Sequence, residues 1–453
     1  MDILVIGGGG REHAIIRKLK ESPKAGVIYC APGNGGISKD AVCVPISAMD
    51  IPAVVSFAKE KKVELVFVAP DDPLAAGMVD ALEAEGIPAF GPRANAAQIE
   101  GSKVFSKDLM KRYGIPTAQY EVFADPAEAI AWIEQNNRFP IVVKADGLAL
   151  GKGVLICPDL QAAKDAVKEI MEDKVFGASG NRVVVEEFLT GPEVSVLAFT
   201  DGRCVKPMVS SKDHKRALDG DQGLNTGGMG TISPNPYYTN EIAETCMKTI
   251  FLPTIEAMKQ EGRPFKGCLY FGLMLTPDGP KVIEYNSRFG DPETQVVLPR
   301  LKTDFVDILM AVVEERLEDQ PIEWSDEACA CVVMASGGYP GHYEKGLPIS
   351  GLDENGQVEG ATVYHAGTAL KDGVFVTNGG RVLGVTALGD TLDQALRRAC
   401  DAVGRIHWKD VHFRHDIGAV ENGRASAFPS CRPSVRRAAQ QAGILQKTGK
   451  GNP

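Results

Sequence analysis

The first residues of the chain limit its fold more than any other feature. An apolar run at residues 3–6 breaks into four glycines at 7–10, and apolar residues at helical spacing follow over 14–19. This order is typical of a buried strand, a tight turn and a crossover helix. Further apolar runs at 27–29 and 65–68 continue the alternation. We therefore predict a parallel sheet with helices on its faces.

The glycine loop differs from a dinucleotide-binding loop. In a G-x-G-x-x-G frame starting at Gly7, the third glycine position holds Glu12. The second predicted strand ends at residues 30–31, Cys-Ala, where a nicotinamide cofactor would require an acidic ribose ligand. We expect no nicotinamide cofactor here. Backbone amides with Arg11 and His13 instead suit a sugar phosphate, and the simpler alternative is a tight turn before a capped helix.

Length and charge narrow the class of protein. A chain of 453 residues is long enough for about three domains. Its 59 acidic and 49 basic residues give a net charge of −10, which disfavours general nucleic-acid binding. No apolar stretch approaches the roughly 18 residues of a membrane span, and the ten cysteines show neither zinc spacing nor a disulfide framework. We expect a cytoplasmic protein that binds neither membranes nor nucleic acids.

The pattern changes twice along the chain. We predict an N-terminal α/β domain at 1–102, a second domain at 103–323 and a small α+β domain at 324–420. Residues 421–453 are rich in Lys, Arg, Gly, Ser and Pro, and we predict a loosely ordered basic tail without an assigned role.

The third domain carries two local signals. Apolar runs at 374–376 and 382–385 flank Asn378-Gly379, which predicts a hairpin with its turn at that dipeptide. After Thr391, apolar residues recur on one face of a predicted helix.

Two lysines suit a nucleotide triphosphate. Lys144 ends an apolar strand, and Lys152 lies in a glycine-rich loop. The loop is not a Walker loop, because Gly153 stands where that motif needs Ser or Thr for magnesium. Such a loop can instead close over phosphates whose charge the two lysines neutralise. A lysine at a strand end that simply reaches solvent is the alternative for Lys144.

A strand at 183–187 ends in two carboxylates, Glu186 and Glu187, and Glu193 follows a Gly-Pro turn. A strand end of this kind offers backbone groups to an adenine edge and a carboxylate to a ribose hydroxyl. A solvated turn explains the same residues equally well.

A sharper pattern lies at residues 281–293. In a strand, Glu284 and Asn286 point to one face. Two such oxygen ligands are typical of a protein site for magnesium whose other coordination positions are filled by phosphates and water. Arg288 continues on that face and can hold a carboxylate or phosphoryl oxygen with two hydrogen bonds. The alternative is a polar edge strand with an ion pair.

These segments together resemble the ATP-grasp fold and, within it, the phosphoribosylamine–glycine ligase family. The resemblance covers about residues 1–418. Its most specific motifs are DHKR at 213–216 and NTGGMG at 225–230; the others are GGGGREHA at 7–14, PGNGG at 32–36, NSRFGDPE at 286–293, GGRV at 379–382 and DIG at 416–418.

The resemblance implies a fold and a set of site residues. It implies an N-terminal parallel-sheet α/β domain, an ATP-grasp domain with a mobile lid at about 121–190, and a small C-terminal α+β domain. Magnesium or manganese would be bound by Glu284 and Asn286. ATP would be bound by Lys103, Lys144, Lys152, Glu186 and Glu193. The catalytic residues would be Lys144, Asp213, Lys215 and Arg288. The substrates would be bound by Gly9, Arg11, Asn34, Gly36, Asp213, Lys215, Asn225, Thr226, Gly227, Gly228, Met229, Arg288, Asp291, Glu293, Gly380 and Arg381.

The resemblance also implies a reaction. ATP would activate glycine as an acyl phosphate, 5-phosphoribosylamine would attack it, and the products would be glycinamide ribonucleotide, ADP and phosphate. The protein would be a monomer. Two features depart from the family: residues 69–72 read Ala-Pro-Asp-Asp where Gly-Pro-Glu is common, and the basic tail has no counterpart. The rival hypotheses are another ATP-grasp ligase and a non-catalytic nucleotide sensor.

Overall fold

The apolar run at the start of the chain forms β1 (Ile3–Gly7), in which every residue is buried. In the computed structural model, which describes residues 1–148 and 153–419, this strand is the centre of a parallel sheet with the order β3-β2-β1-β4-β5. The predicted parallel α/β fold is confirmed. The other strands are β2 (Ile28–Pro32), β3 (Val42–Cys43), β4 (Leu65–Val68) and β5 (Ala89–Phe90).

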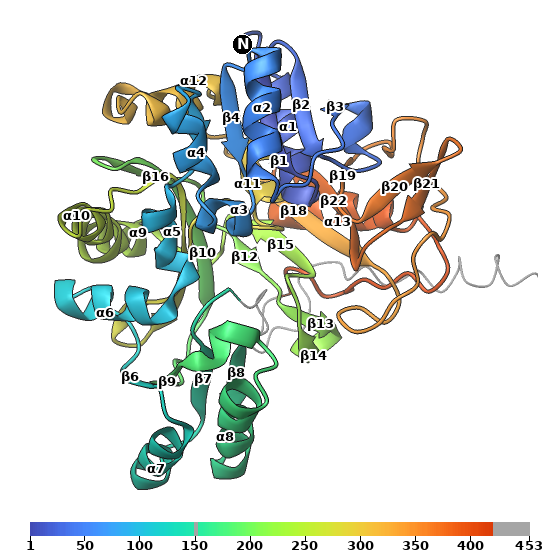
Figure 1. Ribbon diagram of the computed structural model, residues 1–453. Helices are drawn as coiled ribbons and strands as arrows, with labels where there is room; N and C mark the ends of the chain where they lie inside the picture. Colours follow the sequence, from blue (N-terminus) through green and yellow to red (C-terminus); the bar gives the residue numbers. More distant parts are fainter. Residues whose placement is uncertain (149–152, 420–453) are drawn as a thin grey trace, which may run out of the picture.

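Helices flank this sheet, which is blue at the top of Figure 1. The first begins after the glycine loop, where the Glu12 carboxylate accepts a hydrogen bond of 2.5 Å from the backbone N–H of Gly9. Glu12 therefore caps the helix from the position that a dinucleotide loop would give to glycine. The helices are α1 (Gly10–Lys20), α2 (Ile51–Lys61), α3 (Asp71–Ala75), α4 (Met78–Ala84) and α5 (Ala94–Gly101).

A smaller sheet projects below the rest of the molecule in Figure 1. It follows α6 (Lys103–Tyr113), which Ser102 caps at the start and Gly114 ends with φ +65°. Its strands are antiparallel in the order β6-β9-β7-β8, and it lies within the predicted lid region. The elements are β6 (Tyr120–Phe123), α7 (Pro126–Asn136), β7 (Ile141–Ala145), β8 (Val154–Cys157), α8 (Leu160–Val167) with a π-helical extension (Lys168–Glu172), and β9 (Val183–Glu187).

The middle part of the chain also contains a second antiparallel sheet, with the order β11-β10-β16-β17. Val196, Phe271 and Val282 on its strands pack in one buried cluster with residues of α6 and α10. The elements are β10 (Glu193–Asp201), β11 (Val205–Pro207), α9 (Asn240–Cys246) with a π-helical extension (Met247–Phe251), α10 (Leu252–Gln260), β16 (Lys266–Thr276), β17 (Gly279–Asn286), α11 (Thr294–Val297) and α12 (Phe305–Val313).

The C-terminal sheet has the order β12-β15-β18-β22-β19 and thus takes two strands from before residue 324. The division of the chain at 323/324 stays a prediction. The predicted helix after Thr391 is present, and the Thr391 hydroxyl accepts from the N–H of Gln394. The elements are β12 (Lys212–Asp213), β13 (Arg216–Leu218), β14 (Gln222–Asn225), β15 (Gly230–Ser233), β18 (Ala328–Ala335), β19 (Thr362–His365), β20 (Thr368–Lys371), β21 (Val374–Thr377), β22 (Arg381–Gly389) and α13 (Leu392–Val403).

The predicted hairpin around Asn378-Gly379 is wrong. β21 pairs with β20 instead, and β22 pairs with β18 and β19. The hairpin turn is Asp372-Gly373, whose φ angles of 50° and 79° suit a two-residue β-turn. The N–H of Asn378 donates to the carbonyl of Gly367. The Asn378-Gly379 dipeptide therefore connects β21 and β22, which belong to different sheets.

Among residues 1–148 and 153–419, no helix has the length and apolar character needed to cross a membrane. The predicted basic tail and Lys152 lie outside the described residues.

Candidate active site

A cavity of about 430 Å³ is lined by residues of the two middle sheets, the N-terminal domain and the C-terminal sheet. Charged and polar side chains dominate its wall, and they come from segments far apart in the sequence. Its charged lining residues are Arg11, Asp71, Glu100, Lys103, Lys107, Lys144, Asp213, Lys215, Glu284, Arg288, Asp291, Glu293 and Arg381.

One end of the cavity holds three cations and a buried carboxylate. Lys144 on β7 forms an ion pair with Glu186 on the neighbouring strand β9, and it donates to the carbonyl of Ile283 at 3.2 Å. Lys107 on α6 reaches the other oxygen of the same carboxylate at 2.5 Å. Burial opposes ionisation of Glu186, but the charges of the two lysines outweigh it and lower the pKa of Glu186.

Lys103 lies one turn before Lys107 on α6 and donates to the carbonyl of Gly147 at 3.0 Å. Desolvation lowers the pKa of Lys103, although the charge of Glu284 opposes the shift. Desolvation also lowers the pKa of Lys107, to about 8. Lysines close to an anion-sized space can neutralise phosphate charge.

The two predicted metal ligands, Glu284 and Asn286, both line the cavity. They lie two residues apart on β17. Lys215 approaches the Glu284 carboxylate at 3.2 Å, and its charge is the main cause that lowers the pKa of Glu284 to about 2. The described residues contain no group of three or more His, Cys, Asp or Glu side chains arranged for a metal. Two oxygen ligands fit magnesium, which takes one or two protein oxygens together with phosphates and water.

Arg288 follows β17 and is held in place by Glu100, at the end of α5. Its Nη2 donates to Oε1 of Glu100 at 2.9 Å, while the N–H and hydroxyl of Ser287 donate to the other carboxylate oxygen at 2.7 and 2.8 Å. The Nε of Arg288 is buried and has no hydrogen-bond partner among the described residues. Arg288 itself lines the cavity, so this fixed guanidinium places its positive charge there.

Carboxylates and one arginine form the opposite end. Desolvation, reinforced by the charge of Glu293, raises the pKa of Asp213 well above its usual value. Arg381 donates to the carbonyls of Gly227 and Asp291 at 2.6 and 2.7 Å and joins β22 to this end. A carboxyl group with a raised pKa beside an arginine is suited to proton transfer and to binding a substrate carboxylate.

The NTGGMG segment brings backbone close to this end of the cavity. Gly228 has φ +116°, and a Cβ there would lie 2.5 Å from Cδ of Pro292 and 2.6 Å from Oδ1 of Asp213. Only glycine fits so close to the cavity wall. Thr226 and Gly227 themselves line it.

Most of the predicted site residues lie around this one cavity. Those that line it are Arg11, Lys103, Lys144, Asp213, Lys215, Thr226, Gly227, Glu284, Asn286, Arg288, Asp291, Glu293 and Arg381. Those described outside its lining are Gly9, Asn34, Gly36, Glu186, Glu193, Asn225, Gly228, Met229 and Gly380. Glu186 acts on the cavity through Lys144.

Asn34 and Gly36 lie at a junction between the N-terminal domain and β19. The Asn34 amide donates to the carbonyls of Gly8 and His365 at 2.9 and 2.8 Å, and its oxygen accepts from the N–H of Gly36. A Cβ on Gly36 would lie 2.1 Å from Cγ of His365. Their predicted contact with a sugar phosphate remains a prediction.

Sequence reasoning missed two side chains that shape the site. Lys107 lies four residues after Lys103 on the same helix, and that spacing was a usable signal for a shared face. Glu100 is held against Arg288 across 188 residues, and no local pattern points to that pair.

The fold and the polar cavity define a protein of the ATP-grasp class, and residues 101–294 match the ATP-grasp (A) domain of phosphoribosylglycinamide synthetase. Residues 1–100 match the N domain of the same enzyme, and residues 329–420 match its C domain. The chain belongs to the phosphoribosylglycinamide synthetase family, also called the phosphoribosylamine–glycine ligases. The family resemblance seen in the motifs is confirmed.

Individual relatives agree over almost the whole chain. It is 48% identical over 419 residues to the phosphoribosylamine–glycine ligase of Caldanaerobacter subterraneus, covering 92% of this chain and 100% of that one. It is 49% identical over 428 residues to the Brucella melitensis enzyme, covering 94% and 100%. The crystal structure of the Thermotoga maritima phosphoribosylamine–glycine ligase has a TM-score of 0.80 at 33% identity, covering 92% and 100%. A biotin carboxylase domain from Hydrogenobacter thermophilus shares the fold alone, with a TM-score of 0.69 at 17% identity.

Proposed function

We propose that the chain uses ATP to join glycine to 5-phosphoribosylamine, giving glycinamide ribonucleotide, ADP and phosphate. The observation that carries this proposal is that Lys144, the oxygen pair on β17 and Arg288 face one cavity. Together they supply cations for a triphosphate, ligands for a metal and a donor for a developing anion. Family membership supports the choice of substrates.

The metal would be magnesium or manganese, bound by Glu284 and Asn286 together with the phosphates of ATP. It would screen the charge of the phosphates during transfer. Lys103 and Lys144 would contact the phosphates, and Glu186 would keep Lys144 in position. We retain the predicted roles of Lys152 and Glu193 at the ATP site.

In the first step, a glycine carboxylate oxygen attacks the γ-phosphorus and the bond to the bridging oxygen of ADP breaks. The product is glycyl phosphate, because a carboxylate itself is too poor an electrophile for an amine. Arg288, fixed by Glu100, would stabilise the acyl phosphate through the charge of its guanidinium.

In the second step, the amine of phosphoribosylamine attacks the acyl carbon and phosphate leaves. The attacking nitrogen must lose a proton, and Asp213 would accept it, since its raised pKa brings it closer to the range of a general base. Lys215 and Arg381 would hold the carboxylate and phosphate groups of the substrates. Arg11 would approach the sugar phosphate from α1.

The domains would divide at about 102 and 323, with a lid at about 121–190. The protein would act as a cytoplasmic monomer. Sedimentation equilibrium tests the last point, and a dimer at micromolar concentration contradicts it.

The function is tested by ADP release from the purified full chain with ATP, magnesium and freshly made phosphoribosylamine, with and without glycine. We expect glycine-dependent ADP and glycinamide ribonucleotide in equal amounts, and loss of both when the metal is chelated. Glu284→Gln should weaken metal binding. The metal concentration required for half-maximal turnover should rise at least about tenfold. ATP binding without turnover would favour the nucleotide sensor, and turnover with another carboxylate and amine would favour a different ligase.

A further inference from the structure

A second cavity, of about 350 Å³, lies between α1 and β19. Among the described residues it shares no lining side chain with the candidate active site. Its size is within the range of sites for small organic ligands. It is lined by Ala14, Arg17, Lys18, Lys20, Glu21, Asp40, Leu298, Pro299, Thr362, Tyr364 and Leu388.

The charge in this cavity is locally positive in a chain whose net charge is −10. Lys18 donates hydrogen bonds to the Glu21 carboxylate and to the carbonyl of Leu301, at 2.7 and 2.5 Å. Lys20 donates to Asp40 at 2.6 Å. The three cations therefore exceed the two carboxylates by one charge.

Arg17 supplies that excess charge. Its guanidinium comes no closer than 3.6 Å to Asp40, and it makes no hydrogen bond to a described residue. The side chain is 33% exposed, so it is neither buried in a structural ion pair nor fully in solvent. A guanidinium has five N–H donors in a planar fork that fits oxyanions.

The same cavity is lined by a buried tyrosine whose hydroxyl has no hydrogen-bond partner among the described residues. Tyr364 on β19 is 5% exposed, and its hydroxyl has no hydrogen-bond partner in the described part of the chain. Its ring packs edge-on against His13, with centroids 6.0 Å apart. A buried tyrosine usually finds a partner for its hydroxyl. The Tyr364 hydroxyl is therefore available to a ligand in the cavity.

We propose that this cavity is a second ligand site, which binds the phosphate group of a small phosphate monoester. Arg17 and the hydroxyl of Tyr364 are the donors to the phosphate, and Thr362 adds another hydroxyl to the same wall. Leu298, Pro299 and Leu388 form an apolar wall for the organic part of the ligand. The volume exceeds the need of inorganic phosphate alone, so the ligand is an ester.

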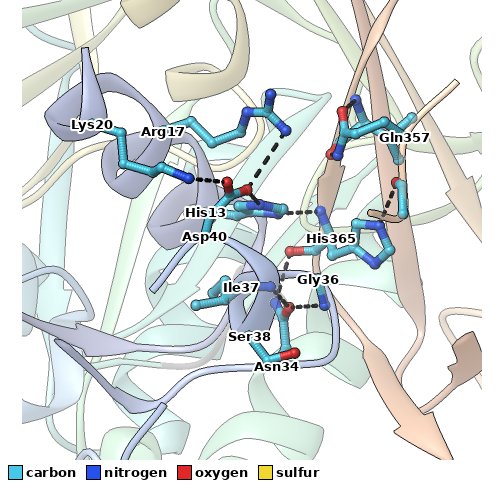
Figure 2. Close-up of polar contacts among 12 residues, drawn as sticks. His13, Arg17, Lys20, Asn34, Gly36, Ile37, Ser38, Asp40, Gln357 and His365 are labelled. Atoms are coloured by element: carbon cyan, nitrogen blue, oxygen red, sulfur yellow. Dashed lines mark hydrogen bonds and ion pairs between the residues drawn. The ribbon is translucent and has the colours of Figure 1, made fainter. Parts of the chain in front are cut away.

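The site is connected to the junction of the N-terminal domain and the C-terminal sheet. Figure 2 shows Arg17 and Lys20 directed at Asp40, and His13 lying between Asp40 and His365. His13 Nε2 contacts Asp40 at 3.0 Å, and its Nδ1 accepts from the N–H of His365 at 2.8 Å. A ligand that contacts Arg17 and Tyr364 bridges the two sides of this junction and stabilises it.

Helix α1 also joins the two cavities. Arg11 near its start lines the candidate active site, and Arg17 near its end lines the second cavity. A rigid helix with residues in both cavities can transmit occupancy of one to the other. A ligand in the second cavity is therefore expected to raise or lower the ligation rate, and that rate is a secondary readout.

The test is calorimetric titration of the full chain with three probes: adenosine 5′-monophosphate, phenyl phosphate and inorganic phosphate. MgADP at saturation keeps the ATP part of the active site filled. We expect at least one of the two esters to bind with Kd below about 1 mM. Arg17→Gln and Tyr364→Phe should each weaken that binding about tenfold or more. The exposed control Lys59→Gln on α2 should leave it unchanged.

Each other outcome overturns the proposal. Binding that survives both variants but is lost in Arg11→Ala or Arg288→Ala places the probe in the active site. Equal affinity for inorganic phosphate and the esters removes the organic part of the assignment. No ester binding tighter than about 5 mM leaves the cavity without this function. Thermal unfolding of Tyr364→Phe distinguishes lost contact from lost fold, since Phe retains the ring that packs on His13.

Discussion

The carboxylate of Glu100 accepts a hydrogen bond of 2.9 Å from Nη2 of Arg288. Desolvation in this contact would lower the pKa of the guanidinium, but the charges of Glu100 and Asp71 raise it overall. Arg288 therefore remains charged, and the end of α5 decides where that charge lies. Glu100 is a positioning residue in this arrangement.

Glu100→Gln should lower kcat about tenfold, or about 1.4 kcal/mol, while leaving the KM for ATP near its original value. An amide keeps the shape but accepts more weakly from Arg288 and Ser287. Steady-state kinetics with each substrate varied measures the effect, and the exposed Glu85→Gln is the control. An unchanged kcat with an intact fold would mean that Glu100 does not position Arg288.

Lys107→Met should raise the KM for ATP about tenfold with a smaller change in kcat. Without Lys107, the Glu186 carboxylate keeps only Lys144 as its cation and holds that lysine away from a phosphate. Binding of ATP without turnover can be measured by calorimetry. Lys111→Met, on an exposed part of the same helix, is the matched control. Equal effects of the two changes would contradict a specific role for Lys107.

Gly36→Ala should destabilise the protein by about 1–3 kcal/mol. The added Cβ meets His365, whose ring is held by Gly356 and Thr368 at 2.8 and 3.0 Å and cannot move aside easily. Urea unfolding measures the change. Gly101→Ala is the control, because nothing lies within 4 Å of its Cβ position in α5. A raised KM for phosphoribosylamine without loss of stability would instead support the predicted sugar-phosphate contact.

Stability should fall as the pH is lowered from about 6.5 towards 3. Burial lowers the pKa of His365 and of His214 to about 3, from an ordinary value of 6.5. Below pH 6.5 the unfolded chain therefore binds protons that the folded chain does not, so protons favour unfolding. The stability is fully present above pH 6.5 and is lost through this window. Thermal unfolding from pH 7.5 to 4 measures it.

His365→Gln should reduce the slope of the unfolding free energy against pH. The reduction should correspond to at most one fewer proton taken up on unfolding. Glutamine can donate to Gly356 and accept from Thr368 but does not titrate. His342→Gln, at an exposed position, should leave the slope unchanged. An unaltered slope in His365→Gln would show that this histidine is not protonated on unfolding within the window.

Much of the fold and of the site was visible in the sequence where the signal is local. The apolar run before the glycines forms β1. Ser102 caps the start of α6 with its side chain, and Gly114 ends the helix in the left-handed conformation, as these residue types commonly do. Glu284 and Asn286 lie together because a strand repeats every two residues. The hairpin prediction failed although Asn-Gly is a good turn former, because Asp372-Gly373 forms a two-residue turn nearer to β20.

The sequence by itself therefore determined the elements, the parallel N-terminal sheet and the family motifs, since backbone propensity and residue spacing act over a few neighbours. Only the tertiary structure decided that β12 and β15 join the C-terminal sheet, that Glu100 holds Arg288, and that Arg17 and Tyr364 line one second cavity. Those relationships depend on packing between segments about a hundred or more residues apart. Their energies come from burial and from partners that no local pattern specifies.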